Sequence, residues 1–345
     1  MKVMAVTPGV AGSATVADRD DVPGSGAILV EGLAVGICGT DVEIASGRYG
    51  TAPPGRSDLV VGHESLGKVL DAPAGAPVAS GDLVVGIVRR PDPVPCEACA
   101  VGMWDMCRNG RYTERGIKAL DGYGAQRWRV EPEYVVRVAP ALGALGVLVE
   151  PTSVVAKAWT QIDAIGRRVP VTPRRVLVTG AGPIGLLAAL LAVQRGLEVH
   201  VLDLAVDGPK PDLVADLGAT YHHGAVIDVP EPDVVVECTG VGSVVLQVIR
   251  HAAALSTVCL TGVSSGGRDL PVDVGALNLG LVLENDLVFG SVNANRSHYE
   301  LAAAALAAAD ASWLDRLITR RVALADWTAA LDRTDDDVKV VVDLA

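Results

Sequence analysis

A glycine-rich stretch in the middle of the chain, Val176–Gly185, constrains the fold more than any other feature. It reads VLVTGAGPIG and carries the G-x-G-x-x-G spacing. The residues around it predict a buried strand over Arg175–Thr179 and a helix over Ile184–Arg195. In this strand–loop–helix context the spacing indicates dinucleotide binding, because the glycines let backbone N–H groups approach a pyrophosphate at the helix N-terminus. The predicted cofactor-binding residues of this loop are Gly180, Gly182, Pro183, Ile184 and Gly185.

The next predicted strand, Glu198–Leu202, ends at Asp203. A carboxylate at this position accepts hydrogen bonds from the ribose diol of adenosine and repels a 2′-phosphate. Leu204, Ala205 and Val206 follow and supply no guanidinium. The sequence therefore predicts NAD as the cofactor in preference to NADP.

The 345 residues are enough for two domains, and the pattern of predicted strands and helices changes near Glu150. Before that point, short apolar runs between Gly- and Pro-rich turns predict a compact all-β or α+β domain. After it, strands alternate with helices, which is typical of a parallel sheet. The predicted strands of the first half are Ala27–Ala34, Leu59–Val61, Gly67–Leu70, Asp82–Val88 and Tyr134–Val138. The first predicted helix of the second half is Val154–Ile165.

Three side chains suit a catalytic zinc ion. Cys38 in GICGTD and His63 in GHE supply a thiolate and an imidazole. Glu150 lies in the apolar run LVEP, where a carboxylate is costly to bury unless it is paired or bound to a metal. Three protein ligands with an open fourth position form the catalytic type of zinc site, which acts as a Lewis acid on an alcohol or carbonyl oxygen.

A second group of potential ligands is Cys96, Cys99 and Cys107. A closed structural zinc site needs four ligands, and this group has three. Asp92 could be the fourth, whereas Pro93 stands where another cysteine would continue the spacing. The sequence leaves two interpretations open, a structural zinc lobe and a degenerate lobe without metal.

Taken together, these segments resemble the zinc-dependent medium-chain dehydrogenase/reductase superfamily, and within it the archaeal-type glucose 1-dehydrogenases. The resemblance extends in order over nearly the whole chain. Its motifs are Cys38–Asp41, Gly62–Glu64, Arg89–Pro91, Glu114–Ile117, Leu120–Tyr123, Leu148–Pro151 and Gly290–Asn293.

The resemblance implies an α/β fold with a GroES-like β-barrel catalytic domain and a Rossmann domain with a doubly wound parallel sheet. The expected boundaries are 1–153 for the catalytic domain, completed by 294–345, and 154–293 for the dinucleotide-binding domain. Cys38, His63 and Glu150 would surround the catalytic zinc, with Glu64 as an alternate ligand and Thr40 as the proton-relay and substrate-contact hydroxyl. The implied sugar contacts are Thr40, Glu114, Glu150 and Asn293. The implied contacts at the nicotinamide end are Gly262, Val263, Ser264, Ser291, Val292 and Asn293.

The expected reaction is hydride transfer from C1 of a pyranose to NAD, with D-glucose as the best single substrate and the lactone as product. A sugar pocket needs several acids and amides, and it rejects analogues that leave those groups unpaired. Val88 and the residues after Pro151 depart from the family pattern near the substrate, so another polyol, an amino sugar or a cyclitol stays open as the substrate. The residues also leave open a simple secondary alcohol as substrate, a zinc-free reductase and a non-catalytic NAD-binding regulator.

The net charge of −12 makes nucleic acid and anionic membranes unfavourable partners. Val176–Val193 is long enough to span a bilayer, but its glycines and proline favour a strand, a loop and a buried helix. Met1–Val10 lacks the features of a secretory signal, so the expected compartment is the cytoplasm. The resemblance also implies a homodimer or homotetramer.

Overall fold

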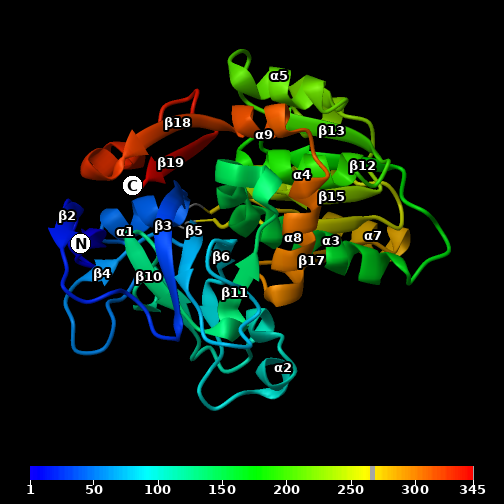
Figure 1. The fold of residues 1–345 in the computed structure, drawn as a ribbon. Coiled ribbons are helices and arrows are strands. Elements are labelled where there is room, and N and C mark those ends of the chain that lie inside the picture. The colour runs from blue at the N-terminus through cyan, green and yellow to red at the C-terminus, as the bar shows by residue number, and fades with distance from the viewer. Residues whose placement is uncertain (265–268, 345) are drawn as a thin grey trace. The chain divides into compact units, whose positions relative to one another are not determined.

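The computed structural model describes residues 1–264 and 269–344. The chain forms two compact units, Met1–Ser153 with Asn293–Ala345, and Val154–Val292. In Figure 1 the first unit comprises the segments coloured from blue through cyan to bluish green and those coloured from orange to red. The chain therefore leaves the first unit after Ser153 and returns to it at Asn293.

A seven-stranded, mainly antiparallel sheet is the centre of the first unit. Its order is β11-β6-β5-β3-β19-β18, and β10 also pairs with β3. Strand β19 comes from the end of the chain and pairs antiparallel with β3, from Val340 opposite Ile37 to Asp343 opposite Ala34. The strands are β3 (Ile28–Ile37), β5 (Glu64–Asp71), β6 (Leu83–Gly86), β10 (Arg127–Val130), β11 (Val135–Arg137), β18 (Ile318–Ala323) and β19 (Lys339–Asp343).

Two smaller sheets and several short helices complete the first unit. The order β2-β1-β4 comprises Thr15–Asp18, Lys2–Val6 and Leu59–Val60, and the order β7-β8-β9 comprises Arg89–Arg90, Thr113–Arg115 and Ala119–Leu120. The α-helices are α1 (Gly39–Ala45), α2 (Glu97–Ala100), α8 (Arg296–Ala307) and α9 (Ala311–Leu317). The 3-10 helices are η1 (Trp104–Met106), η2 (Pro132–Tyr134), η3 (Pro140–Leu148) and η5 (Leu324–Leu331).

The core of the first unit is made mainly of Val, Leu and Ile, because the chain has a single Phe. The fully buried rings of Tyr123, Trp128 and Trp327 fill the larger spaces among them. The Trp327 indole N–H donates to the Thr15 carbonyl over 3.0 Å. The C-terminal segment is therefore part of the core and of a local hydrogen-bond network.

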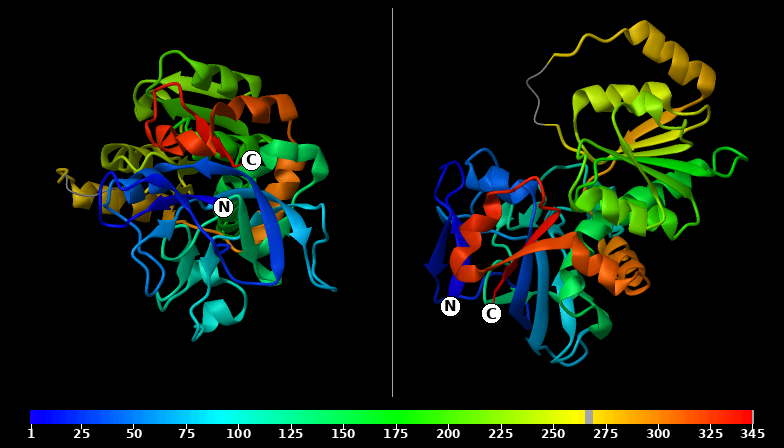
Figure 2. Two further views of the ribbon diagram at one scale, coloured as in Figure 1. Left: turned by 60° about the vertical axis from the view of Figure 1, so that its left-hand side comes forward. Right: turned by 90° about the horizontal axis from the view of Figure 1, so that it is seen from above.

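The second unit is a six-stranded sheet in which every strand pair is parallel, in the order β14-β13-β12-β15-β16-β17. Leu177 on one face packs with apolar residues of α6, while Val178 on the other face lies toward α4. The right-hand view of Figure 2 shows helices on both faces of this sheet. The strands are β12 (Arg175–Thr179), β13 (Glu198–Asp203), β14 (Thr220–His223), β15 (Val234–Glu237), β16 (Thr257–Leu260) and β17 (Leu287–Gly290). The helices are α4 (Pro183–Val193), α5 (Pro209–Asp216), η4 (Val226–Asp228), α6 (Gly242–His251) and α7 (Val274–Glu284).

One predicted boundary differs in a way that matters for the site. The helix predicted from Val154 begins five residues earlier, so α3 covers Val149–Gly166. Pro151 is compatible with this start because the first turn of a helix needs no backbone N–H donor there. Glu150 is therefore a helical residue of the first turn rather than part of a loop.

One continuous helical stretch among the described residues, Pro140–Gly166, is long and apolar enough to cross a membrane. Within the protein, 72% of its most apolar window is buried, as in the core helix of a globular fold. The stretch Val176–Val193, which has a comparable length, forms strand β12, the glycine loop and helix α4.

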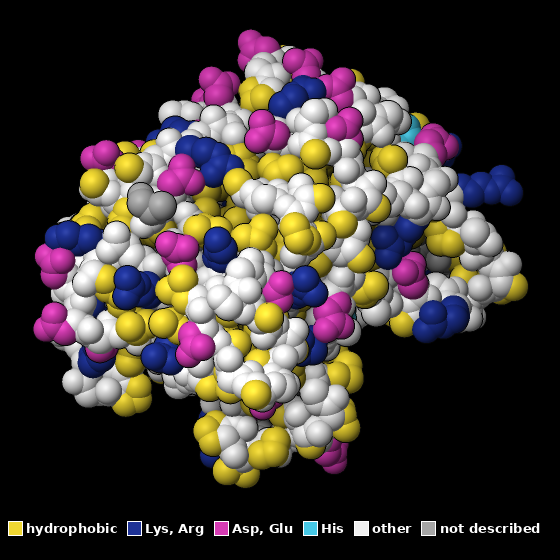
Figure 3. Space-filling model, viewed as in Figure 1, with side chains coloured by type: hydrophobic (Ala, Val, Ile, Leu, Met, Phe, Trp, Pro, Cys, Tyr) yellow, Lys and Arg dark blue, Asp and Glu magenta, His cyan; other side chains and the backbone are white. Residues whose placement is uncertain are grey.

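The charged side chains of both signs are mixed on the surface. On the face in Figure 3, carboxylates lie among lysine and arginine side chains rather than in one separate field. Arg19 and Arg56 illustrate the mixture in the first unit, since each pairs with Asp58 and Asp121. These ion pairs hold together segments that are far apart in the sequence.

Candidate active site

Cys38 lies between strand β3 and helix α1, where its side chain caps the helix. The Thr40 N–H donates to the Cys38 sulfur over 3.3 Å, and the Cys38 N–H donates to Asp41 Oδ2 over 3.0 Å. This reciprocal capping fixes the thiol at the end of the strand. Thr40, on the first turn of α1, is held two residues from it.

His63 reaches the same point from the turn before β5. Its Nε2 lies 3.1 Å from the Cys38 sulfur, and its Nδ1 lies 3.5 Å from Asp41 Oδ1. Burial by itself would lower the pKa of His63, but the nearby Asp41 carboxylate and Cys38 thiolate hold that pKa well above 6.5. The field at this imidazole is therefore negative and favours a bound cation.

Glu64 opens strand β5, and its buried carboxylate forms an ion pair with the Lys339 ammonium group. Lys339 also donates to the Ile37 carbonyl over 3.1 Å. The exposed fractions of the two side chains are 3% and 1%, so this pair is shielded from water. The pair joins the strand after His63 to the last strand of the chain.

Glu150 completes the cluster from the first turn of α3. One ligand atom from each of His63, Glu64 and Glu150 lies within 4.8 Å of the others, and the same holds for Cys38, Asp41 and His63. Burial raises the pKa of Glu150 to about 7; His63 opposes this shift, and Glu64 adds to it. Removing this carboxylate from water is costly unless a cation compensates it.

The donor set fits a zinc ion. It combines a thiol, an imidazole and carboxylates in two groups that share His63, and these are ligand types that zinc takes in catalytic sites. Asp41 stands behind His63 as a carboxylate partner of the second ring nitrogen, an arrangement common for metal-bound histidines. Of the residues proposed from the sequence, Cys38 therefore lies beside His63, and Glu64 and Glu150 lie beside His63 in a second group.

Glu114 and Asn293, two predicted sugar contacts, lie against each other in the first unit. The Asn293 amide Nδ2 donates to Glu114 Oε1 over 2.9 Å. Asn293 has a left-handed backbone with φ of 63°, which Asn tolerates better than most residues, and its own Oδ1 accepts the Ala294 N–H. Glu114 is also bonded to Arg89, which the sequence analysis did not select as a site residue.

The glycine loop has the crowding that its spacing predicts. A Cβ atom on Gly185 would lie 1.8 Å from the Gly180 carbonyl oxygen, so helix α4 can approach the loop only with glycine here. Gly182, by contrast, faces open space and precedes α4 without any side-chain cap. The loop therefore leaves room and free helix N-terminal donors for a pyrophosphate.

Asp203 ends strand β13 beside this loop. Its carboxylate accepts the Ala181 N–H over 2.6 Å and the Ala205 N–H over 3.0 Å. Burial raises the pKa of Asp203, but these two N–H groups and Lys210 outweigh burial and lower it. Lys210, whose Nζ lies 3.5 Å from Asp203, is a cation beyond the three residues Leu204–Val206 from which the absence of a guanidinium was inferred.

Five of the six residues expected at the nicotinamide end come from two loops of the second unit, and Asn293 belongs to the first unit. A Cβ on Gly262 would lie 2.1 Å from the Gly240 nitrogen, and the Ser264 hydroxyl donates to the Gly240 carbonyl. Val263 between them is 83% exposed. On the other loop, the buried Ser291 hydroxyl has no hydrogen-bond partner among the described residues, and the Val292 carbonyl accepts from Lys157. An exposed apolar side chain and an unpartnered hydroxyl suit contact with a ligand.

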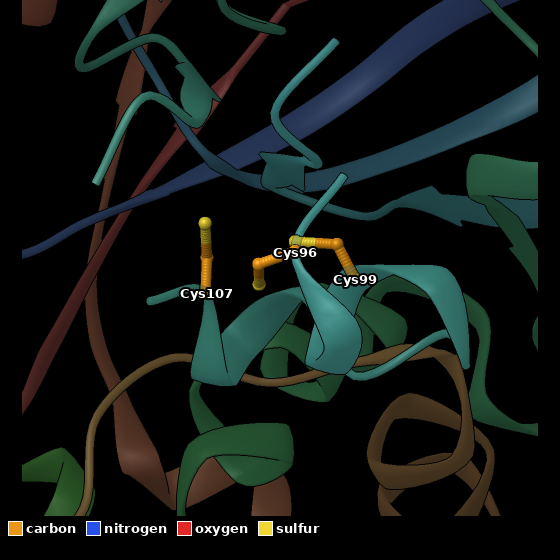
Figure 4. A group of neighbouring side chains, drawn as sticks. All are labelled: Cys96, Cys99 and Cys107. Atoms are coloured by element: carbon orange, nitrogen blue, oxygen red, sulfur yellow. The ribbon is translucent and has the colours of Figure 1, made fainter. Parts of the chain in front are cut away.

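The three sulfur atoms of Cys96, Cys99 and Cys107 lie within 4.8 Å of one another. Figure 4 shows that their side chains come from helix α2 and from the end of η1. Asp92, the predicted fourth ligand, accepts hydrogen bonds from the Val94 N–H, the Asn109 amide and Arg111. These three hydrogen bonds hold the Asp92 carboxylate within the lobe, and the group of potential ligands found among the described residues consists of the three thiols.

Comparisons with known proteins agree with this geometry. Residues 143–344 match the family model "Glucose dehydrogenase C-terminus", and residues 24–140 match "Alcohol dehydrogenase GroES-like domain". A glucose 1-dehydrogenase from Methanocella arvoryzae is 39% identical over 359 aligned positions, covering 100% of this chain and 99% of the relative. One from Thermoproteus tenax is 38% identical and covers 99% of both chains.

The fold comparison leads to the same group. The structure of Haloferax mediterranei glucose dehydrogenase in complex with NADP, Zn and gluconolactone has a TM-score of 0.92 and 32% sequence identity, and it covers 100% of this chain and 99% of its own. The chain therefore belongs to the glucose dehydrogenase family of the zinc-dependent medium-chain dehydrogenase superfamily, with a GroES-like domain and a Rossmann domain. The expected family and fold class are confirmed.

Four residues that support the site escaped the sequence analysis as functional residues: Asp41, Arg89, Lys210 and Lys339. Asp41 is part of the motif GICGTD, and its spacing from Cys38 could have indicated a helix cap. Lys339 is about 275 positions from Glu64 in the sequence, and only the pairing of β19 with β3 brings them together. Its one local signal is a lysine inside an apolar strand.

Replacing Lys339 with Met tests the buried ion pair. The variant leaves the Glu64 carboxylate buried without its partner, so we expect the free energy of unfolding to fall by about 3 to 5 kcal/mol. Urea denaturation measures this change. The matched control is Lys68→Met, which removes an exposed lysine on β5 and should change stability by less than about 0.5 kcal/mol.

The double variant Lys339→Met/Glu64→Gln separates the charge from the packing. Removing both charges should recover a large part of the stability lost in Lys339→Met. A double variant less stable than Lys339→Met would show that the lysine acts through packing alone.

Proposed function

We propose that this protein is a zinc-dependent sugar dehydrogenase that oxidises D-glucose to gluconolactone and transfers the hydride to NAD. The observation that carries the proposal is that His63 lies close to Cys38 in one group of potential ligands and to Glu150 in another, in a unit that also holds the Glu114–Asn293 pair. The relatives named above are glucose 1-dehydrogenases, and they align with 99% or more of this chain. We assign catalysis to residues 1–153 with 293–345 and dinucleotide binding to residues 154–292, one residue short of the expected boundary because Asn293 belongs to the first unit.

In this proposal, each group of residues has a separate task. Cys38, His63 and Glu150 hold the zinc ion, with Glu64 as an alternate ligand. When bound, zinc supplies Lewis acidity to the sugar oxygen and the nicotinamide accepts the hydride. Thr40, fixed next to Cys38 by the helix cap, receives the hydroxyl proton and passes it outward.

The polar groups of the pocket orient the sugar, and the second unit holds the cofactor. Glu114 and Asn293 offer an acceptor and an amide, which suit a ligand with several hydroxyl groups. The N-terminal amides of α4 bind the pyrophosphate, and Asp203 binds the adenosine ribose. Gly262–Ser264 and Ser291–Asn293 contribute to the nicotinamide side.

The alternative substrates differ from glucose in the hydrogen bonds that they would make with Glu114. Another polyol, an amino sugar or a cyclitol would use the same zinc and cofactor residues with different contacts to Glu114. A simple secondary alcohol would leave the buried Glu114 and Asn293 without ligand partners, which is unfavourable. One panel of substrates therefore separates them.

The panel consists of aldoses, polyols, amino sugars, cyclitols and 2-propanol, measured by NADH formation. We expect the highest kcat/KM with D-glucose, and Cys38→Ser should lower it by at least about a hundredfold because serine is a poor zinc ligand. Activity confined to another member of the panel would overturn the assignment of glucose, and full activity of Cys38→Ser would overturn the zinc site.

The cysteine lobe is the second metal site in this proposal. Its three thiols converge without a disulfide, so a zinc ion there would take three thiolates and one solvent ligand. The same protein samples test it by metal analysis. We expect about two zinc ions per chain, with Cys38→Ser and Cys96→Ser each losing about one. One zinc per chain, unchanged by Cys96→Ser, would favour the degenerate lobe.

We further propose that NAD is preferred over NADP, with Lys210 reducing the difference. The Asp203 carboxylate repels a 2′-phosphate, and the Lys210 ammonium group 3.5 Å away offsets part of that charge. Haloferax mediterranei glucose dehydrogenase has been solved with NADP, so the family admits that cofactor.

The ratio of kcat/KM for NADP to that for NAD tests this proposal. We expect a ratio below one in the unmodified enzyme, a fall of about tenfold in Lys210→Met and a rise of about tenfold in Asp203→Ser. Lys68→Met serves again as the control for loss of a positive charge. An unmodified enzyme that prefers NADP would contradict the role given to Asp203.

We also propose that the protein self-associates through helix α7 and strand β17 of the second unit. Helix α7 reads VGALNLGLVLE, and none of its residues is buried. Strand β17 is the edge of the parallel sheet, and an edge strand can pair with an identical strand about a two-fold axis. Because Glu284 is the single charge on α7, two copies of this acidic chain can meet there without strong repulsion.

Light scattering after size exclusion tests the self-association. Leu279 and Leu283 are 58% and 66% exposed and lie one turn apart on α7. We expect a dimer or tetramer that Leu279→Glu weakens by at least about tenfold in its dissociation constant. Leu301→Glu, a change at an exposed leucine of α8, should leave assembly intact. A monomeric unmodified protein, or an unchanged Leu279→Glu assembly, would refute the proposed surface.

The proposed compartment is the cytoplasm. All six cysteines are free thiols, as expected where thiols stay reduced. Cell fractionation that places the protein outside the cytoplasm would contradict this.

A further inference from the structure

We propose that Arg89 is a positioning residue that fixes Glu114 for the substrate, so that one oxygen of the Glu114 carboxylate is held by the protein and the other contacts the sugar. The inference rests on the proposed sugar dehydrogenase activity. It adds a residue whose effect on specificity is indirect.

The hydrogen bonds on Glu114 are strongly unequal. Arg89 Nε and Nη2 donate to Oε1 over 3.1 and 3.0 Å, and Asn293 Nδ2 donates to the same oxygen over 2.9 Å. All the hydrogen bonds that the described residues make to this carboxylate fall on Oε1. Three donors satisfy that oxygen, so Oε2 is the atom left to accept a hydroxyl from the substrate.

Arg89 is itself held rigidly. It is 5% exposed, its Nη1 donates to the Asp105 carbonyl over 3.0 Å, and its guanidinium carbon lies 3.7 Å from the centre of the Tyr112 ring. Asp105 is held in turn by the Asn295 amide, which donates to its Oδ1 over 3.0 Å. The guanidinium therefore has little freedom to turn away from Glu114.

The pairing of strands places the two residues opposite each other. Arg89 of β7 and Glu114 of β8 are direct antiparallel partners, so their side chains lie on the same face of the small sheet. The planar guanidinium supplies two donors to Glu114 and a third to Asp105 at once. A lysine cannot reproduce this, because its ammonium group is a single point on a flexible stem.

The neighbouring Arg90 provides a matched control. It is 8% exposed, its Nη1 donates to the Ile87 carbonyl over 2.7 Å, and its Nη2 pairs with Glu131 over 3.0 Å. Its guanidinium lies 4.0 Å from the centre of the Tyr134 ring. Arg90 thus has the same burial and kinds of partner, but it holds a different carboxylate.

The test compares Arg89→Met, Arg89→Lys, Arg90→Met, Glu114→Gln and the double variant Arg89→Met/Glu114→Gln. Each zinc-loaded enzyme is assayed with D-glucose and with its 2-, 3-, 4- and 6-deoxy analogues, and NADH binding and thermal melting confirm folding. If Glu114 reads one hydroxyl, the unmodified enzyme discriminates strongly against the analogue that lacks it.

For Arg89→Met we expect KM for D-glucose to rise on the order of ten- to a hundredfold, with a much smaller change in kcat. Discrimination against that one analogue should fall by a similar factor, and discrimination against the others should stay. Arg89→Lys should be intermediate, and the double variant should resemble Glu114→Gln because both changes act on the same contact. Arg90→Met should keep the discrimination pattern of the unmodified enzyme whatever its melting temperature.

Three results would overturn the inference. These are an Arg89→Met enzyme with the discrimination pattern of Arg90→Met, a double variant whose losses are additive, and an Arg89→Lys enzyme equal to the unmodified one. If Arg89→Met does not fold, Arg89→Lys decides between the same outcomes. An unmodified enzyme that oxidises no sugar would remove the proposed function and this inference together, which is distinct from an active enzyme insensitive to Arg89.

Discussion

The pairing of the last strand with the longest strand of the first unit is the constraint on which the site depends. Strand β19 lies antiparallel to β3 across four residue pairs, and it brings Lys339 to the carboxylate of Glu64. Both charges are removed from water, so neither is tolerable without the other. The chain can therefore leave the first unit for 139 residues and still return in register. The C-terminal strand therefore supports Glu64, which follows directly on the candidate metal ligand His63.

The site places its acidic groups in contrasting surroundings. Glu150 is buried beside other carboxylates, and burial raises its pKa to about 7. Glu114 is buried beside a guanidinium and an amide that both donate to one oxygen. The first environment favours binding a cation or exchanging a proton, whereas the second holds a fixed acceptor for a hydroxyl. Two carboxylates of one unit can thus serve chemistry and recognition separately.

Much of the fold and site could be predicted because the relevant signals are local. The strand, loop and helix around Gly180–Gly185 are contiguous. The carbonyl oxygen that leaves no room for a side chain at Gly185 belongs to Gly180, five residues earlier. Cys38 and His63 occur in short motifs, and Glu150 stands out as an acid in an apolar run. The family resemblance supplied the rest of the ligand set, and the structure brings those side chains together. Their individual roles stay predictions.

What escaped prediction depends on contacts between distant segments. Arg89 and Asn293 both donate to Glu114, although they are about 200 positions apart in the sequence. Lys339 and Glu64, which form an ion pair, are separated by an even longer interval. Lys210 is only seven residues from Asp203, but the turn before α5 decides whether its ammonium group points back to the carboxylate.

The same reasoning explains why the supporting residues matter as much as the predicted ones. Carboxylates close to one another or to a thiolate repel each other or bind protons unless cations compensate them. Lys339, Lys210 and Arg89 each supply that compensation at a different acid. An acidic chain with 29 basic residues against 41 acidic ones thus places three of those cations at acids of its sites. The arrangement leaves the predicted acids ordered before any ligand binds, so less ordering has to be achieved on binding.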